Sequence, residues 1–157
     1  MSILGLDHAG LTVADLDRSL AFYEGLLGLP VAAVSLLESA EIEAVVGHPG
    51  ARLRIADLAL PSGGVLELIV YEVPDEPPVR TRHTQAGTAH IALQVVNLAE
   101  VHARLLAAGA DLISTEPVPV SGEGEFAGSV VLYVRDPDGN VIELIERPAP
   151  PERVRLA

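Results

Sequence analysis

The sequence predicts an α+β fold of two tandem βαβββ modules, and two repeated patterns lead to this prediction. A turn followed by an apolar strand with a single glutamate occurs at 61–69 and again at 137–145. A short strand pattern with a single histidine occurs at 7–13 and at 89–95, each time before a helical pattern. Internal repetition of this kind indicates a duplicated structural unit.

The chain of 157 residues is long enough for one domain with its own core. We expect the modules to curl into a cupped, half-barrel mixed sheet with the helices on the outside. The predicted organisation of the domain, 1–157, is a first module at 3–73, a Pro-rich linker at 74–87, a second module at 88–147 and a tail at 148–157.

The first module is predicted from helix ends and turns. Asp15 is a favoured N-cap residue, and Gly28, with Pro30 beyond it, ends the helical spacing that includes Tyr23. A turn with two glycines joins the last two strands. The predicted elements are strand 3–13, helix 16–27, strand 31–37, short helix 38–46, and strands 52–60 and 65–72.

The second module repeats this order. Leu98, Val101 and Leu105 are at helical spacing, and Gly109 ends that helix. Glycines and prolines predict a loop in the middle of the module. The predicted elements are strand 88–96, helix 98–108, strand 110–115, loop 116–128, and strands 129–135 and 140–146.

Charge and composition exclude several classes of function. The net charge is −12 with 10 Lys and Arg, which argues against nucleic-acid and anionic-membrane partners. The absence of cysteine excludes thiol nucleophiles and thiolate metal sites. No apolar stretch is long enough to span a membrane and no signal peptide is visible, so we expect a cytoplasmic protein.

The repeated histidines and glutamates are the candidate functional residues. Strand alternation places Glu67 and Glu143 among apolar neighbours, where a carboxylate is costly to bury unless it is neutralised. His8 and His90 lie on strand faces that are otherwise small and polar. If equivalent strands lie side by side, these four side chains line one concave face.

Two imidazoles and two carboxylates suit a borderline or hard divalent cation, such as Ni, Co, Zn, Fe or Mn. A charge of 2+ would neutralise both carboxylates, and an octahedral ion would keep two open positions. We therefore predict a metal site with the ligands His8, Glu67, His90 and Glu143.

Four phrases of the sequence, Asp7-His8, 65–68, 87–92 and 136–146, together resemble the vicinal oxygen chelate superfamily. This superfamily includes glyoxalases, bleomycin resistance proteins and extradiol dioxygenases. The ligand order His-Glu-His-Glu is similar to that of bacterial glyoxalase I. The related methylmalonyl-CoA epimerases typically have Gln at the position of Glu67.

The resemblance implies a metal-dependent lyase or isomerase. Such an enzyme chelates adjacent oxygens of a small carbonyl substrate and transfers the α proton through an enediolate, with Glu143 or Glu67 as the base. Thr12 and Tyr71 replace an Arg and an Asn of the glyoxalase I pattern, which argues against glutathione as co-substrate. The predicted substrate-binding residues are Thr12, Arg54, Tyr71 and Gln94.

Two alternatives remain open from the sequence. One is an Fe(II) dioxygenase that uses His8, His90 and Glu143 as a facial triad, although Glu67 and the scarcity of aromatic residues count against it. The other is a non-catalytic protein that binds a small molecule, such as a drug, in the same fold. By analogy with the family we expect a homodimer, and the ligands can come from one chain or from two.

Overall fold

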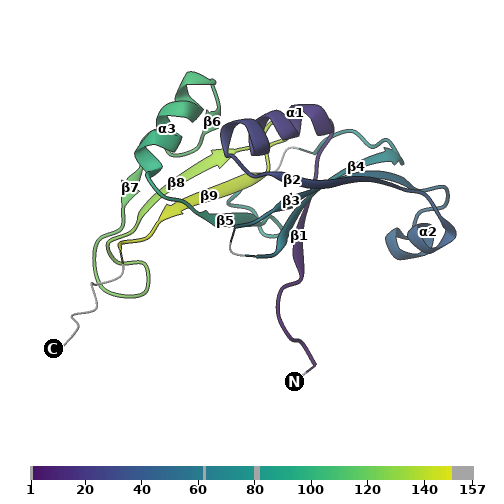
Figure 1. Ribbon diagram of the computed structural model, residues 1–157, viewed down its shortest axis with the longest axis horizontal. Coiled ribbons are helices and arrows are strands. Elements are labelled where there is room, and N and C mark those ends of the chain that lie inside the picture. Colours follow the sequence, from purple (N-terminus) through teal and green to yellow (C-terminus); the bar gives the residue numbers. More distant parts are fainter. Residues whose placement is uncertain (1, 62, 80–81, 150–157) are drawn as a thin grey trace.

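The computed structural model describes residues 2–61, 63–79 and 82–149, and it contains two open mixed sheets (Figure 1). Each sheet is formed by one of the predicted modules. The two βαβββ modules and the α+β class are therefore confirmed.

The first module forms a sheet in the order β1-β4-β3-β2, in which β1 and β4 are parallel and the other pairs are antiparallel. The Asp15 side chain caps the first helix by accepting a hydrogen bond from the Arg18 backbone N–H. The elements are β1 (His8–Thr12), α1 (Leu16–Leu20), the π-helix η1 (Ala21–Leu26), β2 (Val31–Leu37), α2 (Ala40–Val46), β3 (Arg52–Ala59) and β4 (Val65–Val73).

The second module repeats the topology in the order β5-β9-β8-β6, with the short β7 also paired to β8. Strands β5 and β9 are parallel, as β1 and β4 are. The elements are β5 (His90–Gln94), α3 (Leu98–Ala107), β6 (Asp111–Leu112), β7 (Val118–Pro119), β8 (Val130–Arg135) and β9 (Val141–Glu146).

Several predicted elements are shorter or divided in the structure. The first strand begins at His8 rather than at residue 3, because its partner β4 begins at Val65, directly beside His8. The predicted helix 16–27 divides into α1 and η1, and the predicted strand 110–115 reduces to β6. The predicted loop 116–128 contains β7. Most of the predicted tail, 150–157, lies outside the described residues.

The main apolar core lies between the sheets and the helices α1, η1 and α3, and a smaller apolar cluster lies under α2. Helix α1 packs on β3 and β4, while α3 packs on β9 and η1 (Figure 1). Helix α2 instead packs near Leu53 and Ile55, on the other face of the first sheet. Leu66 and Leu68 of the first module and Leu132 and Leu144 of the second are fully buried in the main core. Burial of each such leucine contributes about 1.5–3 kcal/mol. The alternate residues of the same strands occupy the other face.

Polar contacts join the first module to the turn before β9. The Tyr23 hydroxyl donates to Asp136 Oδ2 over 2.9 Å, and Arg18 pairs with Asp138. Asp136 Oδ1 accepts the backbone N–H groups of Asp138 and Asn140, and this closes the turn. The contacts fix the start of the strand that carries Glu143.

None of the described helices is long and apolar enough to cross a membrane.

Candidate metal centre

The first half of the predicted centre consists of His8 on β1 and Glu67 on β4. His8 Nε2 lies 3.4 Å from Glu67 Oε2, and His8 Nδ1 lies 2.8 Å from Asp7 Oδ1. A metal-binding histidine commonly donates its second ring N–H to a carboxylate, which fixes the tautomer. Asp7 plays this part for His8, so Nε2 on the Glu67 side is the nitrogen available to a metal.

The second half consists of His90 on β5 and Glu143 on β9. His90 Nε2 lies 3.1 Å from Glu143 Oε2. The Tyr133 hydroxyl on β8 donates to the same oxygen over 3.0 Å and lies 3.5 Å from His90 Nε2. Both histidine side chains are 48% exposed, so each pair remains open to a partner.

Strand register explains why the same pair forms twice. Gly10 of β1 lies beside Glu67, and Ala92 of β5 lies beside Glu143. Each histidine is two residues before that position, so alternation places it on the same face as the glutamate. Gly10 lets Ile69 and Glu67 pack close to β1, because a Cβ at that position would lie 3.2 Å from Ile69 Cδ1 and 3.9 Å from Glu67 Oε2.

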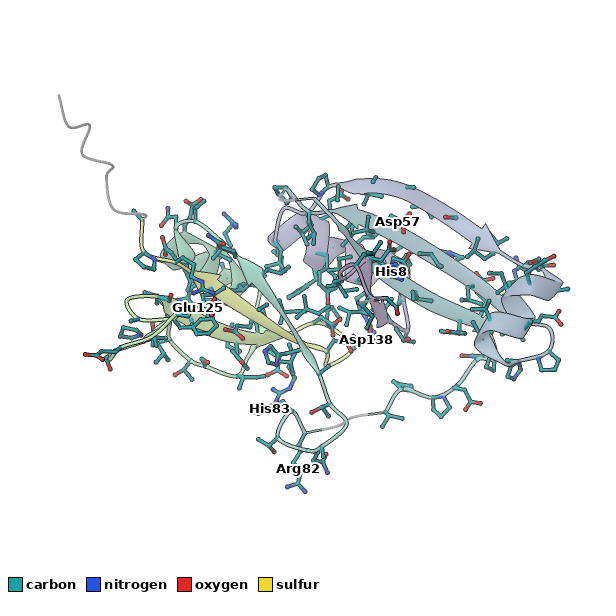
Figure 2. The ribbon with its side chains drawn as sticks, turned by 90° about the horizontal axis from the view of Figure 1, so that it is seen from below. His8, Asp57, Arg82, His83, Glu125 and Asp138 are labelled. Atoms are coloured by element: carbon teal, nitrogen blue, oxygen red, sulfur yellow. The ribbon has the colours of Figure 1, made fainter. Side chains whose placement is uncertain are left out.

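Two further site residues, Asp57 and Tyr133, were missed by the sequence reasoning. Antiparallel pairing places Asp57 directly opposite Glu67 and Tyr133 directly opposite Glu143, and opposite residues share a face of the sheet. In Figure 2, His8 lies close to Asp57 on the first sheet. The equal lengths of the two hairpins put both residues at the same distance before their glutamate, and that spacing was the available signal.

His8 and Tyr133 both have raised pKa values. The hydrogen bond to Asp7, and next the Glu67 carboxylate, raise the pKa of His8 above 6.5, and Asp57 adds to the effect. Burial, and then the hydrogen bond to Glu143, raise the pKa of Tyr133, so the phenol keeps its proton at neutral pH.

The two halves are separate within one chain. Among the residues that the structure describes, no group of three or more His, Asp or Glu side chains is arranged to hold a metal ion. One chain therefore forms the pairs His8–Glu67 and His90–Glu143 without bringing all four side chains together.

The predicted substrate-binding residues lie in three different places. Thr12 and Tyr71 share the strand face of His8 and Glu67, and both line a cavity of about 600 Å³. Gln94 lies on the exposed face of β5 with His90. Arg54 alternates with Ile55, so its side chain is on the face opposite to Glu67, 3.8 Å from Glu72. The structure thus brings Asp57, rather than Arg54, next to Glu67.

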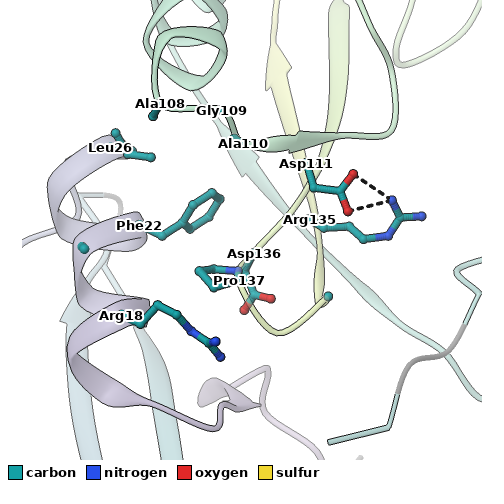
Figure 3. Close-up of a pocket in the computed structure, with 12 residues that line it drawn as sticks. Arg18, Phe22, Leu26, Ala108, Gly109, Ala110, Asp111, Arg135, Asp136 and Pro137 are labelled. Atoms are coloured by element: carbon teal, nitrogen blue, oxygen red, sulfur yellow. Dashed lines mark hydrogen bonds and ion pairs between the residues drawn. The ribbon is translucent and has the colours of Figure 1, made fainter.

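A separate cavity of about 520 Å³ lies on the helix side of the molecule (Figure 3). Phe22 and Leu26 of η1 form an apolar wall, and Arg18 and Arg135 lie at its edge. Both arginines already pair with carboxylates, Arg18 with Asp138 and Arg135 with Asp111. The cavity contains none of the predicted site residues.

The donor atoms of each pair suit a divalent cation. One imidazole nitrogen and one carboxylate are ligands for borderline and hard metals. Two donors are fewer than the three protein ligands of a typical catalytic metal site. Each pair alone therefore provides too few ligands for a site of that kind.

The fold and the paired His–Glu half-sites define the class, and comparisons with known proteins specify it. Residues 5–144 match the model of the Glyoxalase/Bleomycin resistance protein/Dioxygenase superfamily. The chain belongs to this superfamily, as its motifs predicted.

Relatives with named activities lie within the same superfamily. A lactoylglutathione lyase from Salmonella typhimurium is 33% identical over 139 residues, which cover 88% of this chain and 90% of that protein. A 2-epi-5-epi-valiolone epimerase from an Actinomyces species is 27% identical over 154 residues, covering 93% and 81%. These relatives support an enzyme of the glyoxalase or epimerase kind at the level of the family.

Solved structures agree with the fold. A glyoxalase family protein from Bacillus cereus superposes with a TM-score of 0.80 at 24% identity, covering 94% of this chain and 96% of that one. A glyoxalase family protein from Enterococcus faecalis gives a TM-score of 0.61 at 26% identity, covering 93% and 100%.

Proposed function

We propose that this protein is a divalent-metal-dependent enzyme of the glyoxalase or epimerase type, with the ligands His8, Glu67, His90 and Glu143. The observation that carries the proposal is the pair of equivalent half-sites, in which imidazole and carboxylate are 3.4 Å and 3.1 Å apart. Two such pairs on equivalent strands of a duplicated fold are difficult to explain as unrelated polar contacts.

We further propose that a second copy of the chain completes each site. The first half-site of one copy would meet the second half-site of the other, and a twofold axis would create two identical sites. The half-exposed histidines and the separation of the pairs within one chain support this arrangement. It corresponds to the homodimer expected from the family.

The proposed reaction is proton transfer α to a carbonyl group in a substrate with adjacent oxygens. A bound divalent cation would supply Lewis acidity to those oxygens. Glu67 and Glu143 are the candidate bases, because both carboxylates lie on the same face as a metal-binding histidine.

The cavity at Thr12 and Tyr71 supports a substrate without an anionic tail. Its lining includes the carboxylates Asp75 and Glu76, while no basic side chain of the described residues lines it. A glutathione conjugate carries two carboxylates, which would meet like charge here. We therefore expect a neutral substrate, or one that presents hydrogen-bond donors to this cavity.

Elemental analysis of the purified protein, combined with deuterium wash-in at the α carbon of a small hydroxyketone, tests the proposal. We expect about one divalent ion per chain and metal-dependent exchange. Stoichiometric iron with oxygen uptake on a catechol would instead support the dioxygenase. Ligand binding by a protein that takes up no added metal would support a non-catalytic binder, and either result would contradict the proposal.

A further inference from the structure

The two half-sites differ at one equivalent strand position. Glu67 faces Asp57 across the β3–β4 pair, and Glu143 faces Tyr133 across the β8–β9 pair. One carboxylate therefore has a second carboxylate as its cross-strand neighbour, whereas the other has a phenol. This difference breaks the symmetry between two glutamates that the repeat makes otherwise equivalent.

The Tyr133 phenol is hydrogen-bonded to Glu143. The Tyr133 hydroxyl donates to Glu143 Oε2 over 3.0 Å, and the Tyr133 and His90 rings are in contact, with centroids 5.5 Å apart. Hydrogen bonds to a charged acceptor are stronger than those between neutral groups. The Glu143 carboxylate is thus fixed beside His90, and any movement away from it must break this bond.

Glu67 has the opposite surroundings. Asp57 carries like charge and repels Glu67, and within the described part of the chain no hydroxyl group donates to the Glu67 carboxylate. The Glu67 side chain is 22% exposed, so it also has more room to move than Glu143, which is 14% exposed.

We propose that Tyr133 is a positioning residue, whose hydroxyl keeps Glu143 in place as a permanent metal ligand and leaves Glu67 as the carboxylate that accepts the α proton. This inference depends on the function proposed above. In the reaction, Glu67 accepts the proton from carbon, and the C–H electron pair moves towards the carbonyl group. The resulting Glu67 carboxylic acid then returns the proton to carbon, so atoms and charge balance.

Tyr133→Phe tests the positioning role because it removes the hydroxyl and keeps the ring. We expect the affinity for Ni²⁺ or Zn²⁺, measured by competition with a chelating dye, to fall about 10–100-fold. The thermal midpoint of the metal-free variant should fall less than that of Tyr23→Phe, because Tyr133 is partly exposed whereas Tyr23 is fully buried. An unchanged metal affinity would overturn the inference.

Tyr23→Phe is the matched control, since it removes the same group from the buried contact with Asp136. We expect it to show the reverse pattern, with a lower thermal midpoint and unchanged metal affinity of the folded protein.

The chain has three tyrosines and no tryptophan, which permits a spectroscopic readout. Metal addition should change the near-ultraviolet tyrosine absorbance of the unmodified chain, and Tyr133→Phe should abolish most of that change.

A second pair of variants tests the division of roles. Glu67→Gln should retain metal and lose α-proton exchange, whereas Glu143→Gln should lose the metal itself. The reverse pattern would overturn the assignment. If the unmodified chain takes up no metal, the proposed function fails together with this inference. If it takes up metal but the variants behave alike, only the inference fails.

Discussion

The two half-sites share the same strand pairing but differ in the side chains around each His–Glu pair. In both, a parallel strand pair places a histidine next to a glutamate, with side-chain atoms 3.4 Å apart in the first and 3.1 Å in the second. In the first, carboxylates surround the pair, from Asp7 beside the histidine and Asp57 opposite the glutamate. In the second, the added group is the phenol of Tyr133.

The two modules share the His–Glu pair and differ at the position opposite each glutamate. Register fixes the pair, because a shift of one residue would move the histidine or the glutamate to the helix side. The position opposite each glutamate has no such constraint. The two equivalent glutamates can therefore have different neighbours. One carboxylate can be fixed while the other remains mobile.

The largest expected effect comes from breaking the second half-site. Glu143→Ala removes both a proposed ligand and the acceptor for Tyr133, so we expect the chain to lose the metal and, with it, metal-dependent α-proton exchange. Deuterium wash-in at the α carbon of a small hydroxyketone measures it. Glu41→Ala, on the exposed surface of α2, is the control and should behave like the unmodified chain. Retained turnover with bound metal would remove Glu143 from the scheme.

A smaller effect concerns the link between the modules. Tyr23 donates to the buried Asp136 carboxylate, which closes the turn that leads into β9. Tyr23→Phe should lower the free energy of unfolding by about 1.5–3 kcal/mol, the usual contribution of a hydrogen bond to a charged group. Urea unfolding at neutral pH measures this, and a change near zero would show that the contact does not stabilise the fold.

The same tyrosine gives a pH dependence of stability. Burial, and next the Asp136 carboxylate, raise the pKa of Tyr23 well above its ordinary value of about 10. The stabilisation is complete below pH 10 and is lost as the pH rises further, because only the unfolded chain can ionise Tyr23. The loss should be about 1.4 kcal/mol per pH unit. Urea unfolding between pH 9 and 11 should show a shallower loss for Tyr23→Phe, and equal slopes would contradict this account.

The smallest expected effect concerns the pKa of His8 in the first half-site. NMR titration of the metal-free chain should give His8 a pKa above 6.5. Asp7→Asn should lower this pKa more than Asp57→Asn does, because the hydrogen bond to Asp7 is the largest cause. A metal binds the neutral imidazole. Metal binding should therefore weaken on acidification at a higher pH than for an ordinary histidine, and a His8 pKa below 6.5 would contradict the geometry.

The sequence was sufficient for the modules and for the pairs. The repeated motifs located both histidines and both glutamates, and alternation placed each pair on one face. Asp57 and Tyr133 depend on hairpin register, which motif spacing alone does not specify, and register places Arg54 on the face opposite to Glu67. Alternation also does not specify which edges of the two sheets meet, so the separation of the half-sites required the structure.

A mixed dimer tests whether two copies of the chain share each metal site. His8→Ala and His90→Ala each damage both sites of their own homodimer. When the two variants are co-expressed with different tags, the mixed dimer regains one site with all four ligands. We expect about one tightly bound divalent ion per purified mixed dimer and none in either homodimer. A mixed dimer as free of metal as its parents would contradict this expectation.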